Sequence, residues 1–298
     1  MFIHRQPVDS SHPQRISSSN PKREAQGSMM AKYHQQNFSI PDSVIYYIAK
    51  NPKTAALYLK MVKTCKYFFI TKPILVFYFL DTFGGKWRVN VKPLDITKYD
   101  CEYWITDVIE VSASEFVDEN ILLPIIPKLY QCDSESLSLS DQIISFNDLS
   151  LIISSAEEID LYYVDVKHSD SSDIPLEDII ATAINAKYVY VYRPTITPKT
   201  MKQLLQIPHF ATLDHFGLYG LSEVFDVDAF YSYMKKNLHT EFYLDFDDQI
   251  TDAFMNQLET IVDEILQTEQ FNYKPPVIYF TGLDIQKYEK LRRICDSH

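Results

Sequence analysis

Pairs of hydrophobic residues separated by a single residue recur through the second half of the chain. The six pairs are Leu137/Leu139, Ile159/Leu161, Val189/Val191, Phe216/Leu218, Phe242/Leu244 and Ile278/Phe280. Because side chains alternate between the two faces of a strand, each pair predicts a short strand with one buried face. Successive pairs lie 22, 30, 27, 26 and 36 residues apart, which predicts one structural unit repeated along the chain.

Amphipathic stretches with helical character lie between these predicted strands. They are residues 146–153, 176–184, 200–205, 227–234 and 253–266. Several starts carry residues that favour a helix N-terminus: Pro198, Asp226 or Asp228, and Thr251. The chain therefore alternates between strand and helix over this whole region.

Two further strands are expected upstream of the repeated pairs. Residues 87–91 and 103–111 have strand character, with β-branched and aromatic residues concentrated in them. Gly84-Gly85 is the only glycine pair in the chain and predicts the turn before the first of these strands.

A strand followed by a helix every 20–30 residues is typical of a leucine-rich-repeat-like solenoid. The asparagine that follows the strand in regular repeats has no fixed position here, since neither Asn237 nor Asn272 matches it. We therefore predict an α/β fold with an irregular leucine-rich-repeat-like solenoid over residues 81–298. A compact α/β domain with a mostly parallel sheet fits the same alternation and is the alternative.

Tyrosines are concentrated at the positions of these strands that should face away from the core. The twelve positions are Ser138, Ser140, Asp160, Tyr162, Tyr190, Tyr192, Gly217, Tyr219, Tyr243, Asp245, Tyr279 and Thr281. Six of the twelve are tyrosines, whereas 21 tyrosines in 298 residues would supply about one by chance. Tyrosine is favoured at protein-binding surfaces, so this face is a candidate binding surface. Tyrosine also has a high β propensity, and a one-residue slip in register would turn the same residues inward.

Residues 40–62 predict two short helices before the repeats. Pro41 stands at the entrance of the first helix, where its missing N–H removes no hydrogen bond, and Asn51-Pro52 ends that helix. Thr54 is a suitable N-cap for the second helix. The apolar positions are Val44, Ile45 and Ile48 in the first helix and Ala55, Leu57, Tyr58, Met61 and Val62 in the second.

The stretch from Ile40 to Phe69 resembles the F-box, a three-helix motif, in the form found in the F-box-like proteins expanded in nematodes. The family pattern opens with Leu-Pro and has apolar residues three and seven positions after the proline. The residues that fill these places are Ile40-Pro41, Val44 and Ile48, and the later Val-Cys-Lys-x-Trp and Asp-Pro-x-Leu elements correspond to Thr64-Cys65-Lys66-Tyr67-Phe68 and Lys72-Pro73-Ile74-Leu75.

The chain departs from the family pattern at three points. Thr64 replaces the valine, Phe68 or Phe69 replaces the tryptophan, and the spacing from Ile40 to Cys65 is slightly longer than usual. An ordinary helical hairpin with a buried cysteine is the alternative for this stretch.

The resemblance implies an F-box-like domain at residues 38–80 that docks on the Skp adaptor of a cullin ubiquitin ligase. The docking residues that it implies are Ile40, Pro41, Val44, Ile48 and Met61. The protein would then be the substrate-recruiting subunit of a Skp–cullin–F-box ubiquitin ligase. Its substrate-binding residues would be Tyr162, Tyr190, Tyr192, Tyr219, Tyr243 and Tyr279. The alternative is a non-catalytic solenoid scaffold whose degenerate F-box no longer binds Skp.

Charge is distributed unevenly along the chain. The whole chain has a formal net charge of −12, but residues 1–38 hold five Lys/Arg against two Asp/Glu. The remainder holds 23 against 38, a net −15. An acidic body does not suit binding to a phosphate backbone, so no nucleic-acid partner is expected. Residues 1–37 are polar, with few large apolar side chains, and are expected to be a disordered tail.

Motifs for catalysis, cofactors or metals are missing from the sequence. There is no GxGxxG, no GxxxxGK[ST] and no GxSxG, and none of the eight histidines forms an HExxH. The four cysteines (Cys65, Cys101, Cys132 and Cys295) form no CxxC pair and have no histidine at a zinc-like offset. We expect no enzyme activity, no cofactor and no metal.

The N-terminus is polar and predicts no signal peptide. The most apolar run, residues 73–80, is too short to span a bilayer. Widely spaced thiols fit a reducing compartment. An intracellular protein, cytoplasmic or nuclear and without a membrane partner, is therefore expected.

Overall fold

The computed structural model describes residues 39–113 and 119–297. The predicted disordered tail, residues 1–37, lies outside the described residues. The chain divides into two compact units after Ile48, within the first described helix. Among the helices of the described ranges, none combines the length and the apolar character needed to cross a membrane.

Three short helices follow Pro41: α2 (Asp42–Lys50), α3 (Ala55–Thr64) and α4 (Lys66–Thr71). The Pro41 carbonyl accepts from the backbone N–H groups of Val44 and Ile45, so α2 starts where the proline predicts it. The side chain of Thr54 caps α3 by accepting from the N–H of Leu57, as expected. The segment predicted as an F-box-like domain at residues 38–80 is not helical throughout, because residues 74–80 belong to the first strand of the sheet.

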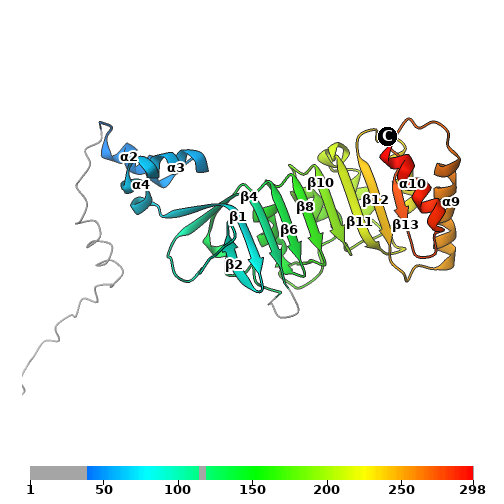
Figure 1. Cartoon of the computed structure of the whole chain (residues 1–298), viewed down its shortest axis with the longest axis horizontal. Coiled ribbons are helices and arrows are strands. Elements are labelled where there is room, and N and C mark those ends of the chain that lie inside the picture. The colour runs from blue at the N-terminus through cyan, green and yellow to red at the C-terminus, as the bar shows by residue number, and fades with distance from the viewer. Residues whose placement is uncertain (1–38, 114–118, 298) are drawn as a thin grey trace, which may run out of the picture. The chain divides into compact units, whose positions relative to one another are not determined.

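The body of the chain is an α/β fold built on a large, mostly parallel sheet of 11 strands (Figure 1). The strands are β1 (Ile74–Phe83), β2 (Lys86–Val89), β3 (Lys92–Pro93), β4 (Glu102–Ser112), β5 (Leu129–Cys132), β6 (Ser136–Ser140), β8 (Glu158–Tyr162), β10 (Tyr188–Tyr192), β11 (His215–Leu221), β12 (Glu241–Phe246) and β13 (Val277–Tyr279). The predicted α/β class is therefore confirmed at the level of a mostly parallel sheet.

From β4 onward the strands lie in the sheet in the order in which they occur along the chain, β4-β6-β8-β10-β11-β12-β13, and every neighbouring pair is parallel. Strand β1 pairs in parallel with β4 on the other side, and β2 and β3 follow as antiparallel strands. A separate two-stranded sheet joins β7 (Ile143–Ser145) and β9 (Asp165–Lys167). Gly84 and Gly85 form the turn between β1 and β2 with positive φ, as predicted.

The connections between the parallel strands contain α5 (Phe146–Ile153), α6 (Leu176–Thr182), α7 (Thr200–Leu204), α8 (Val227–Met234) and α9 (Asp252–Gln267), with 3-10 turns at η1 (Ile126–Lys128) and η2 (Pro208–Thr212). The five helices match the five predicted stretches. Asp226 and Thr251 cap α8 and α9 through their side chains. One further helix, α10 (Ile285–Asp296), follows β13 and was not predicted from the pattern.

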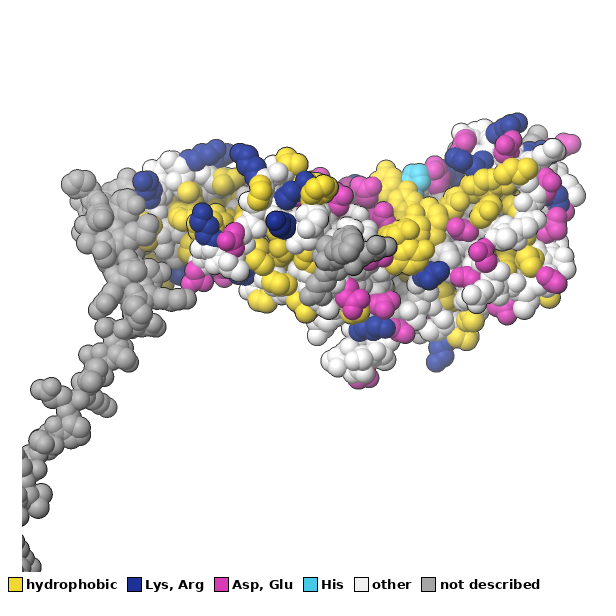
Figure 2. Space-filling view, turned by 60° about the horizontal axis from the view of Figure 1, so that its bottom comes forward, with side chains coloured by type: hydrophobic (Ala, Val, Ile, Leu, Met, Phe, Trp, Pro, Cys, Tyr) yellow, Lys and Arg dark blue, Asp and Glu magenta, His cyan; other side chains and the backbone are white. Residues whose placement is uncertain are grey.

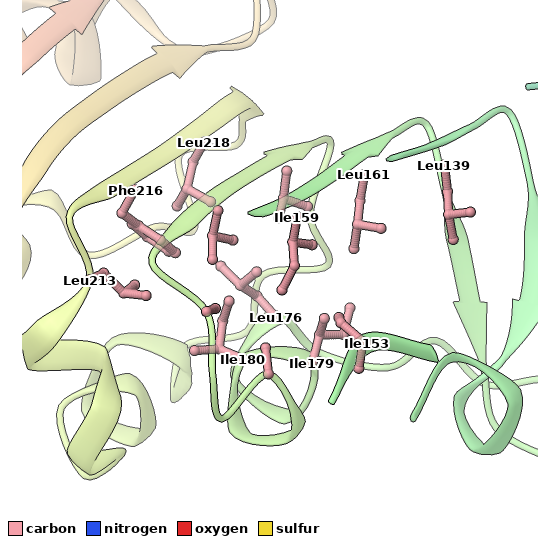
Figure 3. Packing of buried hydrophobic residues seen from close by; sticks show 14 of the residues in the cluster. Leu139, Ile153, Ile159, Leu161, Leu176, Ile179, Ile180, Leu213, Phe216 and Leu218 are labelled. Atoms are coloured by element: carbon pink, nitrogen blue, oxygen red, sulfur yellow. The ribbon is translucent and has the colours of Figure 1, made fainter. Parts of the chain in front are cut away.

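The main core lies between the sheet and helices α5 to α9. All six predicted hydrophobic pairs are buried there, with side chains at most 4% exposed. Figure 3 shows Leu139, Leu161 and Phe216 of the strands pointing toward the helical layer. The helices contribute their own buried apolar residues to this core, among them Ile153 and Ile180. We call this side of the sheet the covered face and the opposite side the open face.

A smaller apolar cluster joins α3 to the start of the sheet. Tyr58, Ile74 and Trp104 are its buried members. The hydroxyl of Tyr58 donates to the Lys72 carbonyl over 2.7 Å and accepts from the N–H of Ile74 over 3.0 Å. Helix α3 therefore packs on the first residues of β1 and β4.

The ends of four successive strands share a backbone feature. The residue directly after the last predicted outward position has a positive φ in each: Asp141 (54°), Tyr163 (52°), Arg193 (53°) and Gly220 (68°). Left-handed backbone is uncommon for residues other than glycine. In β6, β8 and β10 this residue directly follows the strand, whereas Gly220 lies inside β11, at a shift in its register with β12.

Candidate functional site

The open face carries the candidate site, and its residues are aligned by the parallel ladders. One ladder places Ser138, Asp160, Tyr190, Gly217 and Tyr243 side by side across five strands. The residues two positions further along the same strands are Ser140, Tyr162, Tyr192, Tyr219 and Asp245, with Tyr279 opposite Asp245 on β13. All six tyrosines predicted to face outward therefore lie on the open face.

The tyrosine rings touch one another from strand to strand. The ring centroids of Tyr162 and Tyr192 are 4.6 Å apart, and those of Tyr192 and Tyr219 are 4.2 Å apart with an angle of only 6° between the planes. Tyr219 continues to Tyr243 at 4.9 Å. We call Tyr162, Tyr190, Tyr192, Tyr219 and Tyr243 the tyrosine cluster. In Figure 2 hydrophobic side chains, a class that includes tyrosine, gather into patches bordered by acidic side chains.

Gly217 leaves the space that the cluster fills. A Cβ at this position would lie 2.7 Å from Cδ1 of Tyr190 and 3.3 Å from Cε2 of Tyr219. No side chain fits there without moving these rings. The glycine is therefore part of the cluster, because it lets two tyrosines lie over the backbone of β11.

Tyr279 lies apart from the cluster, and helix α10 connects the two. Its ring is 5.1 Å from the ring of Tyr288, whose hydroxyl lies 3.4 Å from that of Tyr243. Helix α10 also packs on α9, where Lys287 bridges to Glu259 and Asp263. The helix thus closes the C-terminal end of the tyrosine surface, a feature that the strand pattern did not reveal.

A pocket of about 430 Å³ opens on this surface over β10 to β13. Tyr190, Tyr219 and Tyr243 line it from the sheet, and the chain around Lys274 and Cys295 lines it from the C-terminal segments. Burial raises the pKa of the Cys295 thiol to about 12, so this thiol stays protonated at neutral pH. Cys295 is therefore not an activated nucleophile in this pocket.

In one carboxylate that lines the pocket, each oxygen contacts a different side-chain nitrogen. Glu241 lies 2.9 Å from Nζ of Lys274 through one oxygen and 3.1 Å from Nδ1 of His215 through the other. The His215 ring in turn stacks on Tyr188 at 4.9 Å. This network holds the N-terminal ends of β10, β11 and β12 together on the open face.

Two other carboxyl groups at the borders of the cluster have raised pKa values. Burial is the main cause of the raised pKa of Asp160, followed by the charge of Glu158. Burial also raises the pKa of Asp245, to about 6, with the charges of Asp248 and Asp247 adding to the effect. Oδ1 of Asp160 is buried and accepts no hydrogen bond from any described residue. A partly buried carboxyl group without a donor is an unsatisfied acceptor facing the cluster.

The hydroxyl groups of the cluster are neutral at physiological pH. Burial raises the pKa of Tyr192 and of Tyr219, and the charge of Asp160 adds to both. Neutral phenols both donate and accept hydrogen bonds. The cluster therefore offers aromatic contact area together with hydroxyl groups, between two carboxyl groups.

The residues predicted to dock on Skp lie partly on the surface and partly inside. Ile40 and Val44 are 44% and 42% exposed, and Pro41 is exposed as well. Ile48 is half-buried. Met61 is half-buried too and packs against the cluster of Tyr58, Ile74 and Trp104, so its side chain contributes to the attachment of α3.

In residues 39–113 and 119–297, no three His, Cys, Asp or Glu side chains come together in a way that could hold a metal ion. No model of a known protein family matches the chain, and no curated protein is significantly similar to it. The F-box resemblance stays a prediction that depends on the motif residues between Ile40 and Leu75.

Proposed function

We propose that this protein is the substrate-recruiting subunit of a Skp–cullin–F-box ubiquitin ligase, acting inside the cell. The segment at residues 40–80, whose helices end at Thr71, would bind the Skp adaptor, and the open face of the sheet would bind a protein substrate. The observation that carries the proposal is the exposed apolar group Ile40, Pro41 and Val44 at the start of α2. These three residues are among those that the F-box resemblance assigns to Skp.

The exposure of these residues is selective. Ile45 and Ala49 of the same helix are 5% and 0% exposed, so α2 already has a buried side. A helix with one buried side has no structural need for apolar residues on its other side, where polar residues would be better solvated. Contiguous exposed apolar residues of this kind typically mark an interaction site.

The second part of the proposal is that the body is an irregular leucine-rich-repeat-like solenoid. Its support is the sequential order of the parallel strands from β4 to β13, with each strand bonded to the strands of the preceding and following units. The left-handed residues Asp141, Tyr163 and Arg193 mark the same turn in three successive units. A stack of units that contact only their neighbours is the defining property of a solenoid.

The proposed mechanism is recruitment without chemistry by the chain itself. Binding a substrate on the open face while α2 binds the ligase converts ubiquitin transfer into a reaction between tethered groups. Tethering raises the effective concentration of the substrate at the ubiquitin-carrying enzyme. The described residues would need only to bind and orient the substrate.

The test is binding of the full-length protein to purified Skp adaptor, by pull-down and by titration. Pro41→Ala/Val44→Asp should weaken binding at least tenfold, about 1.4 kcal/mol, because it places a charge in an apolar contact. Ser43→Asp is the matched control, since it adds the same charge to an exposed position of the same helix. It should bind like the wild type.

Failure of a folded wild-type protein to bind Skp would overturn the ligase proposal. Equal binding by Pro41→Ala/Val44→Asp would overturn the assignment of the docking residues. Circular dichroism and thermal melting of each variant establish that the chains compared are folded.

A non-catalytic scaffold with a degenerate F-box is the second candidate, and one observation favours it. Met61 and Tyr58 of α3 pack on the sheet through the cluster with Trp104. Helix α3 therefore already has a structural role at the beginning of the sheet, which would preserve it without any Skp partner. In that case the same titration shows no binding to Skp, while the open face still binds its partner.

A further inference from the structure

Three carboxyl groups beside the tyrosine cluster have no basic partner in the described part of the chain, and neither does Glu110, further along the open face on β4. Glu158, Asp160 and Asp245 accept no side-chain hydrogen bond and form no ion pair among residues 39–113 and 119–297. Two other carboxylates of the same face are paired: Asp81 with Arg88, and Glu241 with Lys274 and His215. The fold therefore pairs some carboxylates of this face and leaves those beside the tyrosine cluster without a basic partner.

The unpaired carboxyl groups lie on both sides of the tyrosine cluster. Asp160 is next to Tyr190 in the ladder, and Tyr190 is followed by Gly217 and Tyr243. Asp245 follows Tyr243 by two residues on β12, on the same face. The charges of both aspartates act on the hydroxyl of Tyr192, which lies between them. The arrangement is an aromatic surface with an acidic group at each end.

We propose that the open face binds an extended, arginine-bearing segment of a partner protein, with guanidinium groups at Asp160 and at Asp245 across the tyrosine cluster. This inference rests on the proposed function in one respect, namely that the bound partner is a ligase substrate. It adds the chemical class of the segment that binds. The occupant follows from charge complementarity, because the body of the chain has a net charge of −15 and the unpaired groups of this face are acids.

Arginine fits this surface better than lysine does. Its planar guanidinium group binds a carboxylate through two parallel hydrogen bonds and packs against aromatic rings. Lysine offers a compact, strongly hydrated charge without that plane.

The separation of the two aspartates sets the spacing of the arginines. Three steps between neighbouring strands and a displacement of two residues along β12 separate them by roughly 16 Å. In an extended peptide, side chains four residues apart point the same way with their Cα atoms about 13 Å apart, and the long arginine side chain spans the rest. Side chains three residues apart point to opposite sides. The predicted motif is therefore Arg-x-x-x-Arg.

The test is fluorescence anisotropy with labelled synthetic peptides and the full-length protein at 0.15 M salt. The Arg-x-x-x-Arg peptide should bind at least tenfold more tightly than a peptide of the same composition with Arg-x-x-Arg spacing. Replacement of both arginines by lysine should weaken binding several-fold, and replacement by glutamate should abolish it. The Skp adaptor is absent from the assay, so the result does not depend on the docking of α2.

Variants of the protein locate the binding surface. Asp160→Asn and Asp245→Asn keep the shape of each side chain and should each weaken binding of the Arg-x-x-x-Arg peptide about tenfold. Glu110→Gln is the matched control, because Glu110 lies in the same ladder as Asp160, two strands away over β4, and is exposed. It should change the affinity less than twofold.

Three outcomes would overturn the inference. The first is equal binding of the two arginine spacings, and the second is an unchanged affinity in both aspartate variants. The third concerns the chain's own basic N-terminal segment, residues 1–38. If Arg15→Gln/Lys22→Gln/Arg23→Gln strengthens peptide binding several-fold, that segment occupies the face, and the partner is not a separate protein. Peptide binding without Skp binding would leave this inference in place and overturn only the ligase proposal.

Discussion

The two faces of the same sheet differ in what their residues do, although they alternate along the same strands. On the covered face Leu161 is 1% exposed and packs into the main core, whereas its neighbour Tyr162 on the open face is 39% exposed and contacts other tyrosines. The covered face excludes water by closing against α5 to α9. The open face keeps aromatic rings and unpaired acids at the surface, where they contribute less to burial than the residues of the covered face do.

The largest expected effect belongs to the covered face. Leu161→Ala should destabilise the protein by about 3 kcal/mol, because it removes buried methyl groups and leaves a cavity. Tyr162→Ala should cost less than about 1 kcal/mol, since its side chain is partly solvated already. Urea unfolding followed by circular dichroism measures both values. Equal losses would show that the open face contributes to stability as the covered face does.

An intermediate effect is expected inside the tyrosine cluster. Gly217→Ala places a Cβ 2.7 Å from the Tyr190 ring and should destabilise the protein by about 1–2 kcal/mol through overpacking. In a Tyr190→Ala background the same substitution should have almost no effect. A double-mutant cycle by urea unfolding measures this coupling. An unchanged penalty in the double variant would mean that the rings do not occupy the space above Gly217.

The smallest expected effect is a gain in stability, produced by removing the carboxyl group of Asp245. Burial raises the pKa of Asp245 from its ordinary value of 3.8 to about 6 in the folded protein. Between these two values the folded state holds more protons than the unfolded state, so the free energy of unfolding falls as the pH rises through this window. The penalty of ionising this carboxyl group is nearly complete about one pH unit above that folded value.

Asp245→Asn should therefore raise the melting temperature at pH 7.5 by roughly 1–3 °C, a value reduced because the group is partly solvated. At pH 2.5 variant and wild type should melt together, since the carboxyl group is then almost fully protonated in both states. Glu110→Gln on the exposed part of the same face serves as the control. A lower melting temperature of Asp245→Asn at pH 7.5 would mean that the ionised carboxylate is stabilised in the fold. A gain in stability with a loss of peptide binding would identify Asp245 as a residue kept for binding.

The repeated strands and helices could be predicted from the sequence because the patterns that indicate them involve only residues close together in the chain. Leu137/Leu139 and the five pairs after them alternate with period two, and each pair is buried in the structure. The five predicted helices are present because their apolar residues recur at helical spacing. Residues such as Thr251 also cap a helix start, since its side chain accepts a hydrogen bond from the N–H of Phe254. The same register placed all six predicted tyrosines on the open face.

Other features were not predicted from the sequence because they depend on contacts between residues far apart in the chain. The run at residues 73–80 was assigned to the helical segment, but it is strand β1, buried on one side by the main core and at its start by Tyr58 of α3. Helix α10 was missed, although Asp284 at its N-cap and apolar residues such as Leu291 at helical spacing indicate it. Its Tyr288 completes the tyrosine surface.

The sequence alone determined the alternation of strand and helix, the two faces of each strand and the concentration of tyrosines on one of them. These are properties of residues one to four positions apart, where backbone geometry sets the periodicity. Only the tertiary structure decided that the strands lie in chain order, that Gly217 makes room for two rings, and that Glu241 is paired while Asp160 and Asp245 are not. Each of these depends on residues from different strands, whose proximity is created by the crossover connections and cannot be read from local periodicity.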